Sequence, residues 1–347
     1  MRGLAAAALA AVEEPAGMRL LPYDELTSAH LDTWHRLRAG NPALDSPYFH
    51  PGFAAAVHAS GRPVHVAVSP QALMAVHRDG SCLRPAGWPG ADFQGPLLAP
   101  GAAFEPLELL GGGITAFAFD HLVDGVPGFE QWTLSRRVSP YVDVSGGLDG
   151  YLGRASRAGK DNMGQARRRA AKAGRELGPV RFAADSDDEG VLARVIELKR
   201  AQYAATGAAD YFAAPGRAGL LRRLLRTREA DFSGVLSTLH AGEHLLAAHF
   251  GIRSGGVLHW WFPVYDPAHG KLAPGWILLR ELVQAAPALG IRRIDFGRGD
   301  DEYKRRAKTG EVLVAQGLVT RDPFRLAARR TLERARPALR ALKRRFA

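Results

Sequence analysis

The segment of residues 233–297 decides the fold, because two patterns of apolar residues meet in it. It reads SGVLSTLHAGEHLLAAHFGIRSGGVLHWWFPVY over residues 233–265 and DPAHGKLAPGWILLRELVQAAPALGIRRIDFG over residues 266–297. The first part holds three apolar runs separated by two short glycine turns, which predicts three consecutive antiparallel strands. The second part predicts a loop, a helix that Pro287 kinks or shortens, and a further strand. This order places one helix N-terminus at the edge of the sheet.

That helix is predicted to begin at Gly275, and its N-terminus is a candidate anion site. The first backbone N–H groups of a helix have no partners within the helix, so they can bind a negative charge. Pro274 fits the first turn, where a missing N–H costs nothing, and Gly275 lets a ligand approach the backbone. Lys271 adds a positive charge beside the helix dipole. The alternative is a plain capped loop, because Pro-Gly before a helix is common.

The preceding part of the chain predicts a first half with strands and helices of its own. A short strand and two helices are followed by a hairpin over residues 64–78 and by an irregular region over 85–113 that is rich in glycine and proline. Two strands, QWTLSRR and YVDVS, close this half. The next segment predicts a basic helix that starts at Tyr151 and ends at Gly174.

The composition is that of a globular protein. The chain has 347 residues, of which 46% are hydrophobic and 23% charged, which suits two domains of ordinary size. Its one cysteine, Cys82, excludes an internal disulfide and a cysteine zinc cage, and it fits the reducing cytoplasm. Residues 1–17 are too weakly apolar for a signal peptide and predict a disordered leader, or an upstream extension with Met18 as the start. No apolar stretch approaches the ~20 residues that a membrane span needs.

The net charge of +11 is concentrated in two segments. Residues 151–175 carry eight basic side chains and one acidic side chain, and residues 321–347 carry ten basic and two acidic ones. The rest of the chain is therefore mildly acidic. Such segments favour anionic partners, namely phosphates, lipid headgroups or nucleic acid, and solvated helix faces are the alternative.

The segment 321–347 also has the pattern of an amphipathic helix. Apolar residues recur at alternating spacings of four and three from Ala328 to Phe346, with arginines between them, and Pro337 is expected to interrupt the stripe. Such a helix binds an anionic membrane surface or a partner protein, and a solvated terminal helix is the alternative. We expect a cytoplasmic protein, with a peripheral position at the inner face of the membrane as the other option.

The segment IRRIDFGRGDDEYKRR, residues 291–306, combines a strand, two glycines and an acidic run. Gly297 and Gly299 do not match a dinucleotide fingerprint, which needs a third glycine before a helix, and the chain has no Walker A sequence. It also has no helix with two zinc-binding histidines, no acidic loop of EF-hand spacing and no Gly-x-Ser-x-Gly elbow. We therefore expect neither a metal site nor a Ser-His-Asp hydrolase.

Residues 261–306 resemble the C-terminal signature of the CelD/BcsL-like GNAT acetyltransferases, which are relatives of the FemAB transferases. That signature has a Tyr-Asp pair, then Pro-Gly before a helix, then Asp-x-Gly-x-Gly-x-x-x-Tyr-Lys. Weaker likenesses in NPALDSPYFHPGF, ADFQGPLL, the basic helix and ADYFAAPGRAGLLRRLL extend the resemblance over about residues 18–320. The residues that match the signature are Tyr265, Asp266, Pro274, Gly275, Asp295, Gly297, Gly299, Tyr303 and Lys304.

The resemblance implies an α/β (α+β) fold with two tandem GNAT-like domains, each a mixed, mostly antiparallel sheet flanked by helices. The domains would cover residues 18–150 and 151–320, with the donor site in the second, and the basic tail of residues 321–347 would lie outside them. The implied reaction is acyl transfer from a thioester to an amine or a hydroxyl.

The resemblance also implies a donor site in the loop before the helix, where GNAT enzymes bind a pyrophosphate through backbone amides. Lys304 would pair either with a donor phosphate or with Asp295. The loop lacks the arginine and the second glycine of the usual GNAT pattern, so acetyl-CoA or another acyl-CoA, an acyl carrier protein and a charged tRNA all stay open as donors. The residues expected to bind the donor are Gly270, Lys271, Leu272, Ala273, Gly275, Trp276 and Lys304.

Direct acyl transfer needs a base for the acceptor, a dipole for the carbonyl oxygen and an acid for the leaving thiolate. His249 is a candidate base because the ordinary pKa of histidine lies near neutrality, and a core histidine is the alternative. Asp295, at the end of its strand, is a second candidate for a base or an orienting carboxylate. Tyr265 or Tyr303 would act as the acid or orient the acyl group, and for Tyr303 packing against the sheet is the alternative.

Three functions follow in order of preference. The first is an acyltransferase that modifies a small molecule or an envelope saccharide, as in polysaccharide biosynthesis. The second is a FemAB-like transferase that uses a charged tRNA. The third is a non-catalytic binding or scaffold protein that keeps the GNAT fold.

Overall fold

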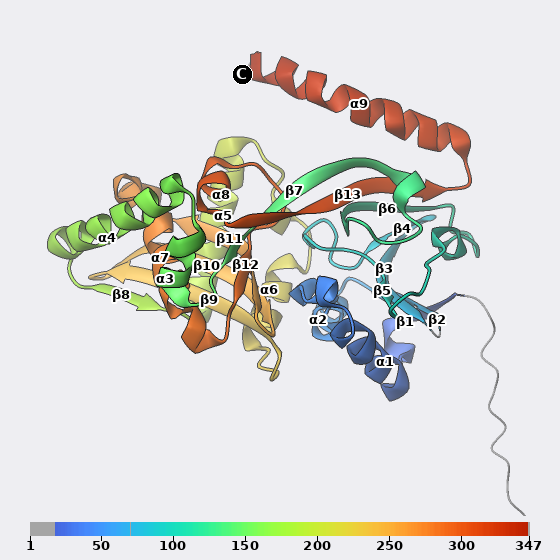
Figure 1. Cartoon of the computed structure of the whole chain (residues 1–347), viewed down its shortest axis with the longest axis horizontal. Helices are drawn as coiled ribbons and strands as arrows, with labels where there is room; N and C mark the ends of the chain where they lie inside the picture. The colour runs from blue at the N-terminus through green and yellow to red at the C-terminus, as the bar shows by residue number, and fades with distance from the viewer. Residues whose placement is uncertain (1–17, 70, 346–347) are drawn as a thin grey trace, which may run out of the picture.

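The computed structural model of the chain describes residues 18–69 and 71–345, with side chains as far as residue 335 (Figure 1). The predicted leader, residues 1–17, lies outside the described residues. Within this part of the chain, no helix is both long and apolar enough to span a bilayer.

The described strands form one continuous sheet. Their order is β1-β2-β3-β4-β6-β13-β7-β12-β11-β10-β9-β8, and β5 pairs with β3. Most neighbours are antiparallel, while β4 with β6 and β11 with β12 are parallel. The strands are β1 (Arg19–Pro22), β2 (His65–Ser69), β3 (Ala72–Asp79), β4 (Cys82–Pro85), β5 (Leu97–Leu98), β6 (Ala116–Val123), β7 (Thr133–Asp143), β8 (Val180–Ala183), β9 (Phe232–Ala241), β10 (His244–Ser254), β11 (Val257–Tyr265), β12 (Arg293–Asp295) and β13 (Gly310–Thr320).

Helices cover both faces of this sheet. The helices α3, α4 and α7 pack on one face of the C-terminal half, and α1, α2, α5 and α6 share one hydrophobic core that reaches from the first half into the second. The predicted α/β (α+β) class, a mixed and mostly antiparallel sheet flanked by helices, is therefore confirmed. The helices are α1 (Ser28–Ala39), α2 (Pro51–Ala59), α3 (Gly147–Arg154), α4 (Arg157–Leu177), α5 (Glu189–Thr206), α6 (Arg217–Arg226), α7 (Pro274–Ala285), α8 (Glu302–Ala307) and α9 (Pro323–Arg345), with short 3-10 turns between them.

The long strands β7 and β13 join the two halves (Figure 1). The strand β13 lies between β6 and β7, although it follows the second half in the sequence, and the domain limits at 150 and 320 stay predictions. Two separate strands were expected where the single strand β7 runs through Pro140. The carbonyl of Pro140 accepts the Phe296 N–H at 3.0 Å, beyond the end of β12. The missing N–H of Pro140 therefore costs no ladder bond at that edge.

The basic helix predicted from Tyr151 to Gly174 is instead two helices, α3 and α4. The break lies at Ser156, whose hydroxyl accepts the Gly159 N–H at 3.2 Å and caps α4. Because serine competes for backbone groups and favours caps, it starts a new helix here. The helix α4 then passes Gly174 and ends before Gly178, which has a positive φ of 105°.

His249, the base expected on β10, lies in the core. It is fully buried and stacks on Trp260 with ring centroids 4.1 Å apart, and neither ring nitrogen has a well-aligned hydrogen-bond partner. Burial lowers the pKa of His249 to about 3. The imidazole therefore packs as a neutral ring in the folded protein.

Replacing His249 with phenylalanine is expected to make the free energy of unfolding fall less as the pH is lowered. The unfolded chain binds a proton at His249 below its ordinary pKa of about 6.5, whereas the folded chain binds it only near pH 3. This histidine therefore destabilises the fold as pH falls through that window, by about 2 kcal/mol at pH ~5. Urea unfolding at neutral and acid pH measures the difference, and an unchanged pH slope in His249→Phe would contradict it.

Candidate active site where two strands separate

The strands β11 and β12 run parallel for three residues and then separate. The last pair is His259 with Asp295, after which β12 ends and β11 continues to Tyr265. The helix α7 starts beside this opening and returns the chain to β12. A stretch of β11 without a neighbour on that side exposes backbone groups and side chains at its edge.

A bulge in β11 occurs at the same place. Phe250 of β10 pairs with Phe262 and Ile252 pairs with His259, so Trp260 and Trp261 stand opposite the single residue Gly251. Such a bulge changes which face later side chains occupy. His259 and Trp261 contact the aromatic cluster around α2, whereas Trp260 packs with α7 on the other face. His259, Trp260 and Trp261 therefore alternate faces, and the alternation fails only at Phe262, which lies in the same core as Trp261.

A cavity of about 320 Å³ fills the opening between β11 and the start of α7. The residues around it come from β11, from the turn before α7, from the first turns of α7, and from α5 and α8. Its walls are mostly apolar, while backbone amides of the turn lie at one end. The lining residues are Gln202, Trp260, Pro263, Val264, Tyr265, Gly270, Ala273, Pro274, Gly275, Trp276, Leu278, Leu279 and Tyr303.

The chain enters α7 through a strained residue at the edge of this cavity. Ala273 has φ 45° and ψ 57°, and among the residues that the structure describes it is the only non-glycine with positive φ. A left-handed residue before a helix turns successive N–H groups toward one point, which forms a concave anion site. Pro274 follows without an N–H, and a side chain at Gly275 would meet no atom within 4 Å. A ligand can therefore approach the backbone at Gly275, whereas the Trp276 N–H already donates to the carbonyl of Ala273 at 3.0 Å.

Four of the residues predicted to bind the donor line this cavity: Gly270, Ala273, Gly275 and Trp276. The predicted loop before α7 is partly a 3-10 helix, η7 (Pro267–Leu272). Within it Lys271 is exposed and outside the lining, and Leu272 is buried in the core.

Lys304, the other predicted donor ligand, holds a turn of its own chain. Its ammonium donates to the carbonyls of Gly297 and Arg298 at 3.3 and 3.2 Å and lies 3.6 Å from Asp301. The ammonium of Lys304 thus pairs with Asp301 and not with Asp295, and its contact with a donor phosphate stays a prediction.

The four predicted catalytic residues divide into two groups. Tyr265 and Tyr303 line the cavity, and burial raises the pKa of Tyr303 well above its ordinary value. His249 and Asp295 are absent from the lining. Asp295 is buried and accepts from Arg293 at 2.9 Å, and burial raises the pKa of this carboxyl against the effect of that guanidinium.

Arg293 also ties the two halves together. It reaches Asp45 of the first half with hydrogen bonds of 2.9 and 2.6 Å, so the guanidinium bridges two carboxylates. Bidentate contacts of this kind fix orientation as well as charge. Asp295 consequently helps to hold the inner end of β12 against the N-terminal half.

A partly buried pair, Asp92 with His259, had no role predicted from the sequence. The Asp92 carboxylate lies 3.0 Å from Nε2 of His259, and a side chain at Gly297 would clash with this carboxylate at 2.1 Å. Burial raises the pKa of Asp92, but the bond from His259 and the positive charges of His121 and Lys304 outweigh it and lower the pKa to about 2. Asp92 is thus ionised and accepts a hydrogen bond from Nε2 of His259.

The tautomer of His259 follows from this contact. A carboxylate only accepts hydrogen bonds, so Nε2 of His259 carries the proton and Nδ1 of the neutral ring has a free lone pair. This Nδ1 is buried without a hydrogen-bond partner, which costs about 1–3 kcal/mol unless something uses it. The rings of Tyr48 and Phe93 surround the imidazole at centroid distances of 4.9 and 6.4 Å.

His121 lies beside the second carboxylate oxygen of Asp92. Its Nε2 lies 3.2 Å from Asp92 and its Nδ1 lies 3.0 Å from Asp120, the latter too oblique for a hydrogen bond. Both neighbours are carboxylates, and the bonds and charges around Asp120 lower its pKa against the effect of burial. His121 thus lies between the two carboxylates of Asp92 and Asp120.

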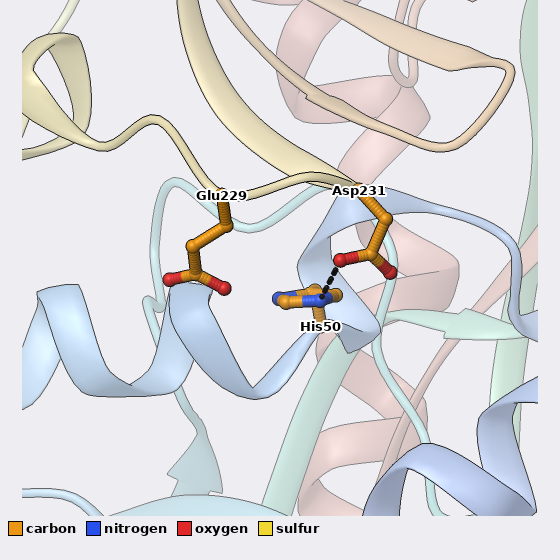
Figure 2. A group of neighbouring side chains, drawn as sticks. All are labelled: His50, Glu229 and Asp231. Carbon is orange, nitrogen blue, oxygen red and sulfur yellow. Dashed lines mark hydrogen bonds and ion pairs between the residues drawn. The ribbon is translucent and has the colours of Figure 1, made fainter.

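A second cluster, formed by residues of both halves, has the composition of a metal site. His50, Glu229 and Asp231 are the one group of described residues whose ligand atoms lie close enough together for an ion (Figure 2). Nδ1 of His50 accepts the Gly52 N–H at 3.0 Å, so the ring proton sits on Nε2 and points to Asp231 at 3.1 Å. A metal would need the lone pair that this proton occupies. The arrangement therefore favours a structural hydrogen-bonded cluster over a metal centre.

Comparisons with known proteins place the cavity within a recognised domain. Residues 161–305 match the family model described as an acetyltransferase (GNAT) domain. This part of the chain is therefore similar to a GNAT acetyltransferase domain. The matched range holds α7, the turn before it and the whole opening between β11 and β12. No curated protein sequence matches the chain.

Solved structures share the fold over most of the chain at low sequence identity. FemX matches with a TM-score of 0.57 and 10% identity, covering 87% of this chain and 96% of its own. The C-terminal domain of a putative lysylphosphatidylglycerol synthetase from Agrobacterium fabrum matches with a TM-score of 0.53 and 11% identity, covering 88% and 95%. A conserved protein of unknown function from Bacteroides thetaiotaomicron matches with a TM-score of 0.51 and 13% identity, covering 84% and 96%. At these identities the likeness concerns the fold alone.

Proposed function

We propose that this chain transfers an acyl group from an acyl thioester, namely an acyl-CoA, to an amine or hydroxyl of a small molecule or an envelope saccharide. The observation that carries the proposal is the cavity at the start of α7, inside the GNAT domain. Its amides suit a pyrophosphate and its apolar walls suit the arm and acyl group of the donor. The saccharide acceptor rests on the resemblance to the CelD-like enzymes.

A lysine beside the cavity supports an anionic donor. Nζ of Lys199 lies 3.4 Å from the carbonyl of Pro263, which lines the cavity, and Gln202 follows one turn later on α5. Burial, together with the charge of Lys304, lowers the pKa of Lys199 to about 8. A cation held at low dielectric attracts a phosphate more strongly than one in water.

The Asp92–His259 pair is the proposed base. The Nδ1 lone pair of His259 takes the proton of the acceptor amine or hydroxyl, while Asp92 holds the ring orientation and stabilises the imidazolium that forms. The freed lone pair of the acceptor attacks the thioester carbonyl carbon, the carbon–sulfur bond breaks, and the thiolate takes a proton from Tyr303 or Tyr265. Donor and acceptor would meet where β11 and β12 separate, from opposite faces of the sheet.

Introducing a negative charge at Gly275 is expected to weaken donor binding. The space around Gly275 admits a side chain, and a glutamate in the first turn of a helix stabilises the helix but repels a bound phosphate. We expect Gly275→Glu to bind acetyl-CoA at least about tenfold more weakly than the matched neutral variant Gly275→Gln. Isothermal titration calorimetry at low salt measures both affinities.

The wild-type titration decides between donors. If the wild-type protein binds no acyl-CoA at millimolar concentration, the coenzyme A version of the proposal is wrong. Binding of tRNA with a steep dependence on salt would then favour the FemAB-like alternative, to which the exposed basic side chains of α4 would contribute.

Removing the imidazole of His259 is expected to abolish most transfer without affecting the donor. His259→Gln should lower the rate of transfer to an amino sugar by about 10²–10⁴-fold and leave acetyl-CoA affinity unchanged. Hydroxylamine is already unprotonated near neutral pH, so transfer to it should fall much less. Release of the free thiol measures both rates.

His249→Phe is the matched control for this test, because His249 is also a buried histidine and lies on the neighbouring strand β10. Equal losses in the two histidine variants, or an equal loss with hydroxylamine and with the amino sugar, would show that His259 acts on folding and not on proton transfer.

A further inference from the structure

The last helix, α9, is attached to the body along one face and, at its start, by Arg325, which donates to Oγ1 of Thr115 at 3.2 Å. It follows β13 and runs along the side of the molecule above β7 and β13 (Figure 1). Arg330 donates to the carbonyl of Gln131 at 3.2 Å, Glu333 accepts from Gln316 at 2.6 Å, and Leu326 packs partly against the core. These three residues are spaced by four and three, so they define the inward face of α9.

The opposite face of α9 presents apolar side chains to solvent. Phe324 is 84% exposed and Leu332 is 58% exposed, and Ala328 and Ala335 are exposed between and after them. At 100° per residue, these four positions point away from the inward face. The sequence continues the same spacing at Leu339 and Leu342. Exposed phenylalanine and leucine in a row are not explained by the fold itself.

The charge of α9 complements this stripe. The helix from Pro323 to Arg345 contains nine arginines and lysines and one glutamate. Arg325 and Arg329 are exposed beside the stripe. The helix also continues through Pro337, where an interruption was expected, because a proline in a solvated helix kinks it without ending it when water satisfies the freed carbonyl.

We propose that α9 lies on the surface of an anionic lipid bilayer, with the apolar stripe between the lipid headgroups and the arginines against their phosphates. An amphipathic helix with a narrow apolar face, low overall hydrophobicity and many arginines has the composition of such interfacial helices. A second copy of the chain is disfavoured as the occupant, because two helices of this charge repel each other. The proposal is independent of the acyltransferase function.

The charge and the apolar stripe make separable contributions to binding. The attraction to anionic lipid falls within a Debye length, so binding should weaken as salt is added. The contribution of the stripe follows buried apolar area and should persist at moderate salt. Both contributions are required for a helix of this length to hold a folded protein at a membrane.

Co-sedimentation of the full chain with vesicles tests the proposal. We expect binding to phosphatidylcholine vesicles that contain phosphatidylglycerol, and at least about tenfold weaker binding to phosphatidylcholine alone. Leu332→Gln removes an apolar side chain of the stripe and should weaken partitioning by about tenfold or more. Ala327→Gln changes an exposed residue beside the stripe and should bind as the wild type does.

Three results would overturn the proposal. They are the absence of binding to anionic vesicles, equal partitioning of the two variants, and sedimentation of the free protein as a dimer that Leu332→Gln dissolves. Circular dichroism and acetyl-CoA titration of each variant check that the fold is kept, so that a lost membrane contact is not confused with unfolding.

Discussion

The separation of β11 and β12 is the constraint on which the rest of the structure depends. Two parallel strands that lose contact after three residue pairs leave unpaired backbone, and such an edge is stable only if something fills or covers it. Here the turn before α7 crosses the opening. Ala273 in this turn has a strained left-handed conformation, which directs the start of α7 toward the opening. The cavity, its apolar walls and the open approach to the backbone at Gly275 are all consequences of that geometry.

The two halves of the sheet meet at the inner end of the same opening. Gly297 has no side chain, and the space is occupied by the carboxylate of Asp92 from the first half. Asp92 in turn fixes the imidazole of His259 at the point where β11 loses its neighbour. The glycine of the C-terminal signature and the aspartate of the ADFQG segment thus belong to one contact between the two halves.

The sequence predicted the elements that depend on local pattern. Alternating apolar runs with glycine turns predicted β9, β10 and β11. The Pro274-Gly275 pair predicted the start of α7 and several residues that line the cavity there. The Asp92–His259 pair was missed because 167 residues separate its members, so no local pattern relates them. His249 is chemically as suitable a base as His259, and only the surrounding packing distinguishes them.

Hydrogen–deuterium exchange with and without acetyl-CoA measures the central claim most directly. If the amides that open α7 hold the donor, exchange in the peptide spanning residues 264–281 slows when acetyl-CoA is added, while exchange around His50 and along α9 does not change. Unaltered exchange in that peptide at saturating donor, or protection confined to another part of the chain, would contradict the account.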